Sequence, residues 1–295
     1  MTVGTLFIFT AVVLRIISNP LANVFQKQLT ARGNHPLLIN FLTYFILALL
    51  TIPILVKTQW NMLPLAFWIF ALLDGLTGAL GNGLLIKALQ KGDLSILGPV
   101  NAYKSVVAII TGIFLLGEIP GIWGLFGIFM IILGSYFVLD TTEEKFSWRL
   151  LKNRAIQYRI GAMVLTAIEA VFIKRIIELS SAELSFASWC WTGAFFSLML
   201  LPAYKIRLRH ELPRLTRLSL GKYALLVLCI GTMQVTTVYA FKHMQVGYAL
   251  SFFQLSIIAS VLLGYRVFRE QEIRKKLLGS AIMIAGSVII ILLGS

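Results

Sequence analysis

The sequence predicts an all-α membrane protein of ten transmembrane helices, built as two inverted five-helix repeats around a central cavity. Three observations lead to this prediction. First, 58% of the 295 residues are hydrophobic and only 13% are charged, whereas a typical soluble domain carries about 25% charged residues. Second, the chain contains ten apolar runs of membrane-spanning length. Third, the chain resembles itself after a shift of 152 residues.

The apolar runs follow one another along nearly the whole chain. A helix of about 20 apolar residues crosses the hydrocarbon core of a bilayer. Glycine, proline or a charged residue interrupts several runs, which is common in transmembrane helices that line a cavity. The runs cover residues 3–26, 37–56, 64–86, 94–116, 121–139, 158–179, 184–204, 220–241, 248–268 and 275–293.

The basic residues indicate the orientation in the membrane. The net charge is +14, and about twenty of the 26 Lys and Arg residues lie in the loops after odd-numbered runs, as in residues 204–223 and 265–276. Such an excess marks cytoplasmic loops, so we expect both termini to face outward. These side chains would then meet lipid head groups rather than nucleic acid. The short tails favour a multi-pass protein of a prokaryotic cytoplasmic (inner) membrane.

The internal repeat predicts the topology. A shift of 152 residues places Glu118 on Glu270 and Gly127 on Gly279 without a gap. Because each copy holds an odd number of helices, the second copy enters the membrane from the opposite side. Inverted repeats of this kind are frequent in transporters, with the substrate site between the copies. The predicted units are a first repeat over residues 1–140, a polar linker over 141–157 and a second repeat over 158–295.

Two groups of repeated residues have predicted structural roles. Gly127 and Gly134 are seven residues apart, as are Gly279 and Gly286, so each pair lies on one helix face and lets two helix backbones approach closely. Glu118 and its counterpart in the second repeat follow apolar runs. We expect these two carboxylates to bond loop amides or a neighbouring basic residue.

The two halves resemble the drug/metabolite transporter (DMT) superfamily and, within it, the EamA-like family. The segment "FLLGEIPGIWGLFGIFMIILG" (114–134) is close to the family pattern, while "FREQEIRKKLLGSAIMIAG" (268–286) has Arg269 in place of a glycine. The resemblance covers nearly the whole chain and implies the fold of a membrane transporter. Relatives of this type handle amino acids, sugars, nucleotide sugars and drugs, so the resemblance implies no single solute.

The first run carries the clearest polar stripe. Arg15, Asn19, Asn23 and Gln26 share one helical face, and Pro20 interrupts the hydrogen-bond ladder beside them. An arginine side chain stays protonated in proteins, so Arg15 needs a carboxylate, water or an anionic ligand. A salt bridge that only holds helices together is the competing interpretation.

The fourth run carries a second polar stripe. Asn101 and Lys104 follow the Gly98-Pro99 pair. Lys104 is too deep to reach the interface easily, so a carboxylate or phosphate of a substrate is a natural partner for its ammonium group.

Two acidic residues lie at comparable depth in the predicted membrane region. Asp74 belongs to the third run and Glu169 to the sixth. Pairing with Arg15 and Lys104 would satisfy both carboxylates, which makes a structural ion pair one interpretation. Proton coupling through Asp74 or Glu169 is the other.

The second half contributes further candidates. Gln234 belongs to the eighth run, and Gln254 falls opposite Ala102 in the repeat. The two halves therefore carry different polar groups, which suggests an asymmetric ligand. Tyr239 could stack on that ligand, whereas Trp189 is expected to be an interfacial anchor. The predicted substrate-binding residues are Arg15, Asn19, Asn101, Lys104, Gln234, Tyr239 and Gln254.

The remaining motifs argue against an enzyme. No glycine-rich phosphate loop is present, so any transport is not driven directly by ATP. His35, His210 and His243 are isolated in loops, and Cys190 and Cys229 lie in separate apolar runs. We therefore expect no metal site, no cofactor and no catalytic residues.

Together these features predict a secondary transporter of a small polar metabolite that works by alternating access. Export of amino acids or related compounds is the favoured interpretation. Transport of phosphorylated or nucleotide-linked sugars is one alternative, and a lipid flippase is another. The expected partners are a small-molecule substrate and the lipid bilayer, with no nucleic acid, and the expected state is a monomer or weak homodimer.

Overall fold

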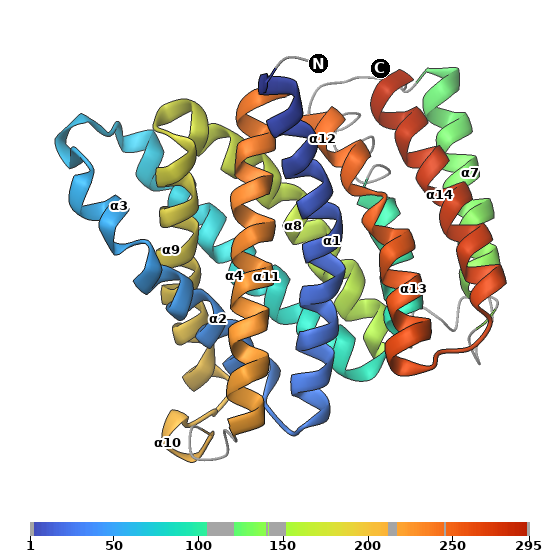
Figure 1. Ribbon diagram of the computed structural model, residues 1–295, viewed down its shortest axis with the longest axis horizontal. Coiled ribbons are helices and arrows are strands. Elements are labelled where there is room, and N and C mark those ends of the chain that lie inside the picture. The colour runs from blue at the N-terminus through green and yellow to red at the C-terminus, as the bar shows by residue number, and fades with distance from the viewer. Residues whose placement is uncertain are drawn as a thin grey trace.

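A computed structural model describes residues 3–104, 121–139, 141, 152–211, 217–244 and 246–293. Every regular element within these ranges is a helix (Figure 1), which confirms the predicted all-α class. The predicted ten-helix count stays a prediction, because much of the fourth run and of the predicted linker lies outside these ranges.

The helices of the first half begin and end at residues suited to these positions. Helix α2 starts at Pro36 after His35, whose Nδ1 accepts a hydrogen bond from the backbone N–H of Leu37 at 3.2 Å. The single apolar run predicted over 37–56 is divided at Thr51 into α2 and α3. The elements are α1 (Val3–Ala31), α2 (Pro36–Leu50), α3 (Ile52–Lys57), the 3₁₀ helix η1 (Trp60–Met62), α4 (Leu65–Lys91), α5 (Leu94–Leu97), the 3₁₀ helix η2 (Pro99–Tyr103) and α7 (Ile122–Leu139).

The second half has similar local signals. Asn153 and Ser181 cap α8 and α9 through their side-chain oxygens. Arg269, which stands where the family pattern has glycine, ends α13 in the left-handed conformation with φ 56°, the geometry that glycine usually supplies at a helix end. The elements are α8 (Arg154–Leu179), α9 (Ala182–Ala203), α10 (Leu208–Glu211), α11 (Arg217–His243), α12 (Val246–Phe253), α13 (Ser256–Phe268) and α14 (Ile273–Leu293).

In both halves the regular α-helix is interrupted within the corresponding run of the repeat. The run predicted over 94–116 begins as α5, which is followed by Gly98 and the 3₁₀ turn η2. The run predicted over 248–268 is divided into α12 and α13 at Gln254 and Leu255. Such breaks free backbone groups and are tolerated in membrane proteins where the backbone faces protein or a water-filled cavity.

Several helices are long and apolar enough to cross a membrane. Within the described part of the chain, four meet this criterion by length and composition: Leu6–Ala31, Leu65–Lys91, Ala182–Ala203 and Arg217–His243. Shorter apolar helices cover Pro36–Leu50, Ile122–Val138 and Ser256–Phe268.

The main helix contacts join the two halves of the chain. Helix α1 packs on α11, α4 on α8, α2 on α9 and α7 on α14. Figure 1 shows α7 and α14 side by side at one edge of the bundle, and α1 beside α11 near its centre.

The predicted glycine faces lie at the contact of α7 with α14. A Cβ atom added to Gly134 would lie 2.6 Å from the carbonyl oxygen of Gly279, and one added to Gly127 would lie 2.7 Å from that of Gly286. Only glycine allows such an approach between two helix backbones, so the predicted packing role is confirmed.

Glu270 has the structural role that the sequence predicts. Its carboxylate accepts hydrogen bonds from the backbone N–H groups of Leu94 at 2.9 Å and Ser95 at 2.8 Å, and from Lys27 Nζ at 3.0 Å. It therefore bonds a basic residue, as expected, and two backbone amides that belong to the first turn of α5 rather than to a loop. Its counterpart Glu118 lies outside the described residues.

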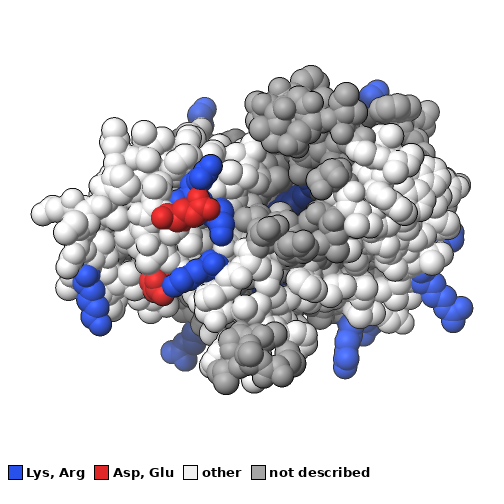
Figure 2. All heavy atoms as spheres, turned by 90° about the horizontal axis from the view of Figure 1, so that it is seen from above, with Lys and Arg blue, Asp and Glu red and all other residues white. Residues whose placement is uncertain are grey.

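The charged residues are distributed unequally between the two ends of the bundle. Figure 2 views the end that carries both termini, where small acidic patches have basic side chains beside them and further basic side chains are seen around the outline; the ion pair between Arg175 and Glu178 belongs to this end. Exposed Lys91, Arg217 and Arg274 lie at the opposite end, where α4 ends and α11 and α14 begin. This distribution agrees with the expected positive-inside pattern, and the orientation itself stays a prediction.

Candidate functional site

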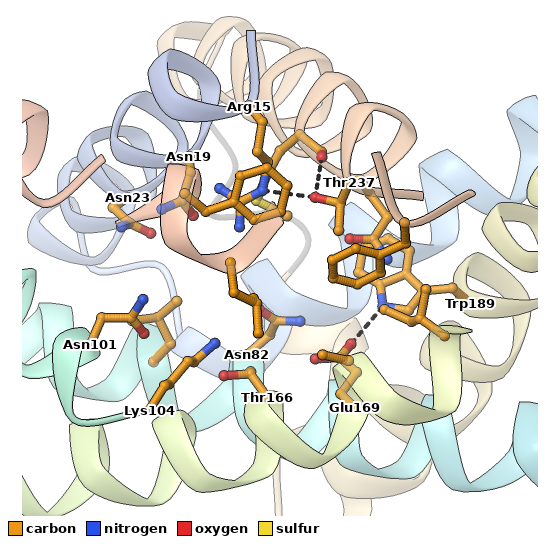
Figure 3. Close-up of a pocket in the computed structure, with 18 of the residues that line it drawn as sticks. Arg15, Asn19, Asn23, Asn82, Asn101, Lys104, Thr166, Glu169, Trp189 and Thr237 are labelled. Atoms are coloured by element: carbon orange, nitrogen blue, oxygen red, sulfur yellow. Dashed lines mark hydrogen bonds between the residues drawn. The ribbon is translucent and has the colours of Figure 1, made fainter. Parts of the chain in front are cut away.

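A cavity of about 110 Å³ lies in the middle of the helix bundle (Figure 3). One buried water needs roughly 10–15 Å³ of such space, so the cavity has room for a small solute. Both halves of the chain contribute to its lining. The lining residues are Arg15, Asn19, Asn23, Asn82, Leu85, Asn101, Lys104, Arg159, Thr166, Glu169, Ala170, Ile173, Trp189, Met233, Gln234, Thr237, Phe241, Leu250 and Phe253.

The structure brings most of the predicted site residues together around this cavity. Of the predicted substrate-binding residues, Arg15, Asn19, Asn101, Lys104 and Gln234 line it. The acidic candidate Glu169 lines it as well.

The other predicted site residues lie away from the cavity lining. Gln254 is buried at the break between α12 and α13, and its Oε1 has no hydrogen-bond partner among the described residues. The ring of Tyr239 packs on His243 of the same helix, with ring centroids 4.2 Å apart. Asp74 is fully buried in α4 outside the lining. The predicted stacking of Tyr239 on a ligand is therefore not what this geometry favours.

Arg15 is held at the cavity wall by neutral neighbours. Its Nε donates a hydrogen bond to Thr237 Oγ1 at 2.7 Å, and its guanidinium lies over the Phe253 ring at 4.8 Å from the centroid. Its Nη1 is buried and has no hydrogen-bond partner in the described part of the chain. The guanidinium is thus fixed in direction while part of its hydrogen-bonding capacity stays open.

The ion pairs of the described residues are elsewhere. They join Lys27 to Asp93 and Glu270, and Arg175 to Glu178. Neither Arg15 nor Lys104 belongs to any of them. The salt bridge considered from the sequence is therefore not formed within the described ranges.

Arg159 is a third basic residue at the cavity, and the sequence prediction missed it. Its Nε donates to the carbonyl oxygen of Leu97 at 2.7 Å, a group that belongs to the break before Pro99. Arg159 is only 7% exposed. The predicted run began at residue 158, which placed Arg159 at the interface, whereas α8 begins at Arg154. The signal in the sequence was the helical spacing from Arg159 to Thr166 and Glu169, since these three residues line the same cavity.

Glu169 is the acidic residue of the lining and is held by an aromatic donor. Trp189 Nε1 donates a hydrogen bond to Glu169 Oε1 at 2.7 Å. Gly78 makes room for this carboxylate, since a Cβ atom there would lie 2.6 Å from Glu169 Oε1. Trp189 is only 2% exposed. The prediction of an interfacial anchor is therefore wrong for Trp189, because its indole is buried in a cluster of packed side chains and donates its N–H to this carboxylate.

Asp74 lies near this carboxylate without a partner of its own. Both of its carboxylate oxygens are buried and accept no hydrogen bond from the residues that the structure describes. The neighbouring polar contact joins Asn82 Nδ2 to the hydroxyl oxygen of Tyr44 at 2.7 Å. The predicted pair of acidic residues thus forms a buried polar region that reaches the cavity through Glu169.

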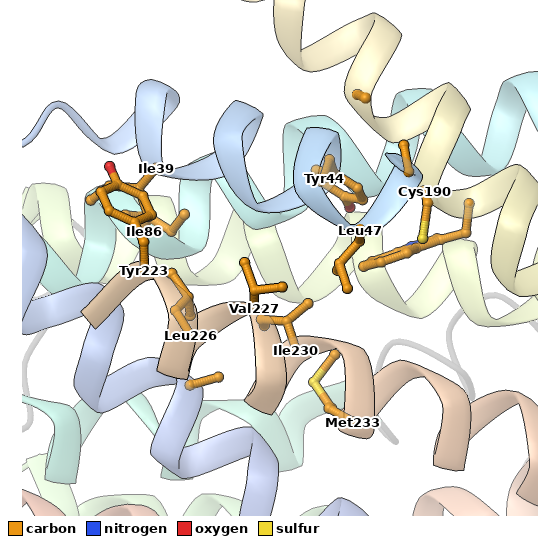
Figure 4. Close-up of a cluster of buried hydrophobic side chains, with 14 of the residues drawn as sticks. Ile39, Tyr44, Leu47, Ile86, Cys190, Tyr223, Leu226, Val227, Ile230 and Met233 are labelled. Carbon is orange, nitrogen blue, oxygen red and sulfur yellow. The ribbon is translucent and has the colours of Figure 1, made fainter. Parts of the chain in front are cut away.

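Apolar packing forms a firm wall behind the cavity. Tyr44 and Trp189 pack ring against ring, with centroids 4.5 Å apart. They belong to a cluster of buried side chains where α2, α4, α9 and α11 meet (Figure 4). Cys190 is buried in the same cluster and is free. A packed wall of this kind holds the polar lining residues in position.

Comparisons with known proteins identify the family. The sequence profile of the EamA-like transporter family matches residues 2–140 and 153–292. A solved structure entitled "Crystal structure of protein" is similar with a TM-score of 0.63 and 15% sequence identity, covering 95% of this chain and 96% of that chain. This likeness concerns the fold alone. No curated protein is similar enough in sequence to match. The chain belongs to the EamA-like transporter family of the DMT superfamily and is a multi-pass membrane transporter.

Proposed function

We propose that the chain is a secondary transporter that moves a small polar solute across the membrane by alternating access. The observation that carries the proposal is the cavity lined by Arg15, Asn101 and Lys104 from the first half and by Glu169 and Gln234 from the second. Charged and polar side chains are costly inside a membrane, so those that are present there commonly mark a functional site. A site between two halves can be exposed to either side by a relative movement of the halves.

The helix contacts support a pseudo-two-fold relation between the halves, which the proposed inverted repeat requires. Helices α1 and α8 are the first long helices of the two halves. Helices α4 and α11 are the third, when the short helices α3 and α10 are left out of the count. Helix α1 packs on α11 and α8 packs on α4, so the first helix of each half contacts the third helix of the other. The last helices, α7 and α14, pack on each other. This reciprocal pattern is what a pseudo-two-fold axis produces.

Proton coupling is part of the proposal. Asp74 is fully buried and its carboxylate oxygens have no partner within the described ranges. Glu169 connects this region to the cavity. A buried carboxylate that changes its protonation during the transport cycle would couple solute movement to the proton gradient.

Solute export from proteoliposomes tests the proposed function. Liposomes holding the purified chain and a mixture of amino acids and organic acids are diluted into a medium of different pH, and the released compounds are measured by mass spectrometry. Release that needs the protein and depends on the pH gradient is expected. Release of none of these solutes, together with movement of a fluorescent phospholipid between leaflets, would favour the flippase instead.

A further inference from the structure

On the basis of the proposed function, we infer that the transported solute is an organic anion whose carboxylate or phosphate group binds between Arg15 and Lys104. The solute then carries more negative than positive charges. This names the class of substrate, which the family does not.

The described cavity lining carries more basic than acidic side chains. Among the lining residues that the structure describes, Arg15, Lys104 and Arg159 are basic and Glu169 is acidic. Both arginines remain protonated in a protein. Buried charges need a partner, and an anionic ligand supplies one where the protein does not. The lining therefore has an excess of positive charge that a neutral or cationic solute would leave uncompensated.

The guanidinium of Arg15 is held in one orientation by its neighbours. Thr237 Oγ1 fixes its Nε at 2.7 Å and the Phe253 ring covers one face of the group. The buried Nη1 has no hydrogen-bond partner in the described part of the chain. A guanidinium presents its donors as a planar fork that matches the two oxygens of a carboxylate or phosphate. Arg15 is thus oriented before the ligand arrives.

The arrangement of the other polar groups gives the ligand an orientation. In Figure 3, Asn101 and Lys104 lie on one side of the cavity, Glu169 and Trp189 on the other, and Arg15 across from both. An anionic group meets Lys104 from the first side and Arg15 from across the cavity, with the amide of Asn101 beside Lys104. The carboxylate of Glu169 repels a second anion on the far side but accepts a hydrogen bond from a hydroxyl or ammonium group.

Binding to the purified protein in detergent tests the inference without requiring transport. The probes form matched sets: L-glutamate against L-glutamine, which differ by one negative charge, and succinate against its diamide. Glutamate or succinate is expected to raise the unfolding temperature, since a ligand of the native state stabilises it by mass action, while glutamine and the diamide, which have no net negative charge, have no effect. Higher salt is expected to weaken binding of the anion.

Variants locate the binding group. Arg15→Gln and Lys104→Gln are each expected to weaken anion binding at least tenfold, and Arg15→Lys, which keeps the charge but loses the fork, by a smaller factor. Arg175→Gln removes an exposed charge outside the cavity and is the matched control with unchanged binding. Size-exclusion profiles and helical content show which variants are folded.

Two results would overturn the inference. One is binding of glutamine or the diamide as tight as that of the matching anion. The other is anion binding that survives unchanged in folded Arg15→Gln and Lys104→Gln. The proposed function fails separately. Anion binding without movement across proteoliposome membranes would reject transport and keep the anion site. Transport of an uncharged solute only would keep transport and reject the anion site.

Discussion

The side chains of Lys27 and Glu270 form an ion pair of 3.0 Å that joins α1 to the turn between α13 and α14. The same carboxylate accepts hydrogen bonds from the N–H groups of Leu94 and Ser95 at the start of α5. Helix α5 leads into η2, which carries Asn101 of the cavity lining. The contact therefore fastens one end of the broken first-half helix to the second half. In an alternating-access cycle such a contact must break when this end opens.

Glu270→Gln is expected to lower the free energy of unfolding by about 1–3 kcal/mol, because a charge-assisted acceptor of two amides and an ammonium group is lost. Thermal unfolding in detergent measures the change. Glu178→Gln, which breaks the exposed pair with Arg175, is the control and is expected to change the stability by less than about 1 kcal/mol. Equal effects of the two substitutions would contradict the role assigned to Glu270.

The stability contributed by Glu270 is expected to depend on pH. Burial raises the pKa of this carboxyl group, but the hydrogen bonds from Ser95 and the charge of Lys27 outweigh burial, so the pKa in the folded protein lies below its ordinary value. The contribution is therefore complete above the unfolded pKa and is lost as the pH falls through the lowered folded value.

Unfolding of the wild type and of Glu270→Gln at a series of pH values tests this sign. The difference in stability between them should be constant from about pH 7 to pH 5 and should shrink below about pH 4. A difference that grew towards acid pH would mean that the folded pKa is raised instead.

Gly134→Ala is expected to destabilise the contact of α7 with α14. The added methyl group would lie 2.6 Å from the carbonyl oxygen of Gly279, and this atom is backbone that cannot turn away. Overpacking of this kind costs about 1–3 kcal/mol. Gly221→Ala serves as the matched control, because a Cβ atom there meets nothing within 4 Å among the described residues and alanine favours the helix. Thermal unfolding of both variants gives the comparison, and a stable Gly134→Ala protein would argue against close backbone packing.

Labelling of introduced cysteines tests the predicted orientation. In a background with Cys190 and Cys229 replaced by alanine, Lys57→Cys and Arg274→Cys each place one exposed thiol at opposite ends of the bundle. A membrane-impermeant maleimide is expected to label Lys57→Cys in intact cells and Arg274→Cys only after permeabilisation, since basic loops stay in the cytoplasm. The reverse pattern would place both termini inside.

The sequence was informative where a function depends on one helix. Asn19 and Asn23 follow Arg15 at intervals of four residues, and all three line the cavity. Their common face follows from the period of the helix, so no tertiary information was needed. The glycines spaced by seven residues were predictable for the same reason.

Contacts between distant segments were not predictable from a single sequence. Arg159 is held by the Leu97 carbonyl, and Trp189 is buried against Tyr44 and held by Glu169. Apart from the helical spacing of Arg159 to Thr166 and Glu169, nothing in the sequence around Arg159 or Trp189 distinguishes them from interfacial residues. The division of the second run at Thr51 does have a local signal, because Pro53 stands at the start of α3, but the hydropathy alone continues without interruption into α3.

Asp74→Asn separates a structural role of this carboxylate from proton coupling. A carboxylate held in a buried ion pair leaves an uncompensated charge when it is replaced, at a cost of about 3–5 kcal/mol. Asp74 is fully buried and accepts no hydrogen bond from any described residue. We therefore expect Asp74→Asn to leave the stability within about 1 kcal/mol of the wild type or to raise it, since an uncharged amide avoids the desolvation of a charge.

The transport assay supplies the second readout for Asp74→Asn. Uptake driven by a pH gradient in proteoliposomes should be lost, because the amide cannot take up a proton, while exchange of labelled for unlabelled solute at equal pH should continue. Glu178→Gln, on the surface, should keep both activities. A loss of stability of 3 kcal/mol or more would make Asp74 a structural partner of a residue outside the described ranges. Gradient-driven uptake by a stable Asp74→Asn protein would leave Glu169 as the carboxylate through which coupling could occur, since it is the acidic residue at the cavity lining.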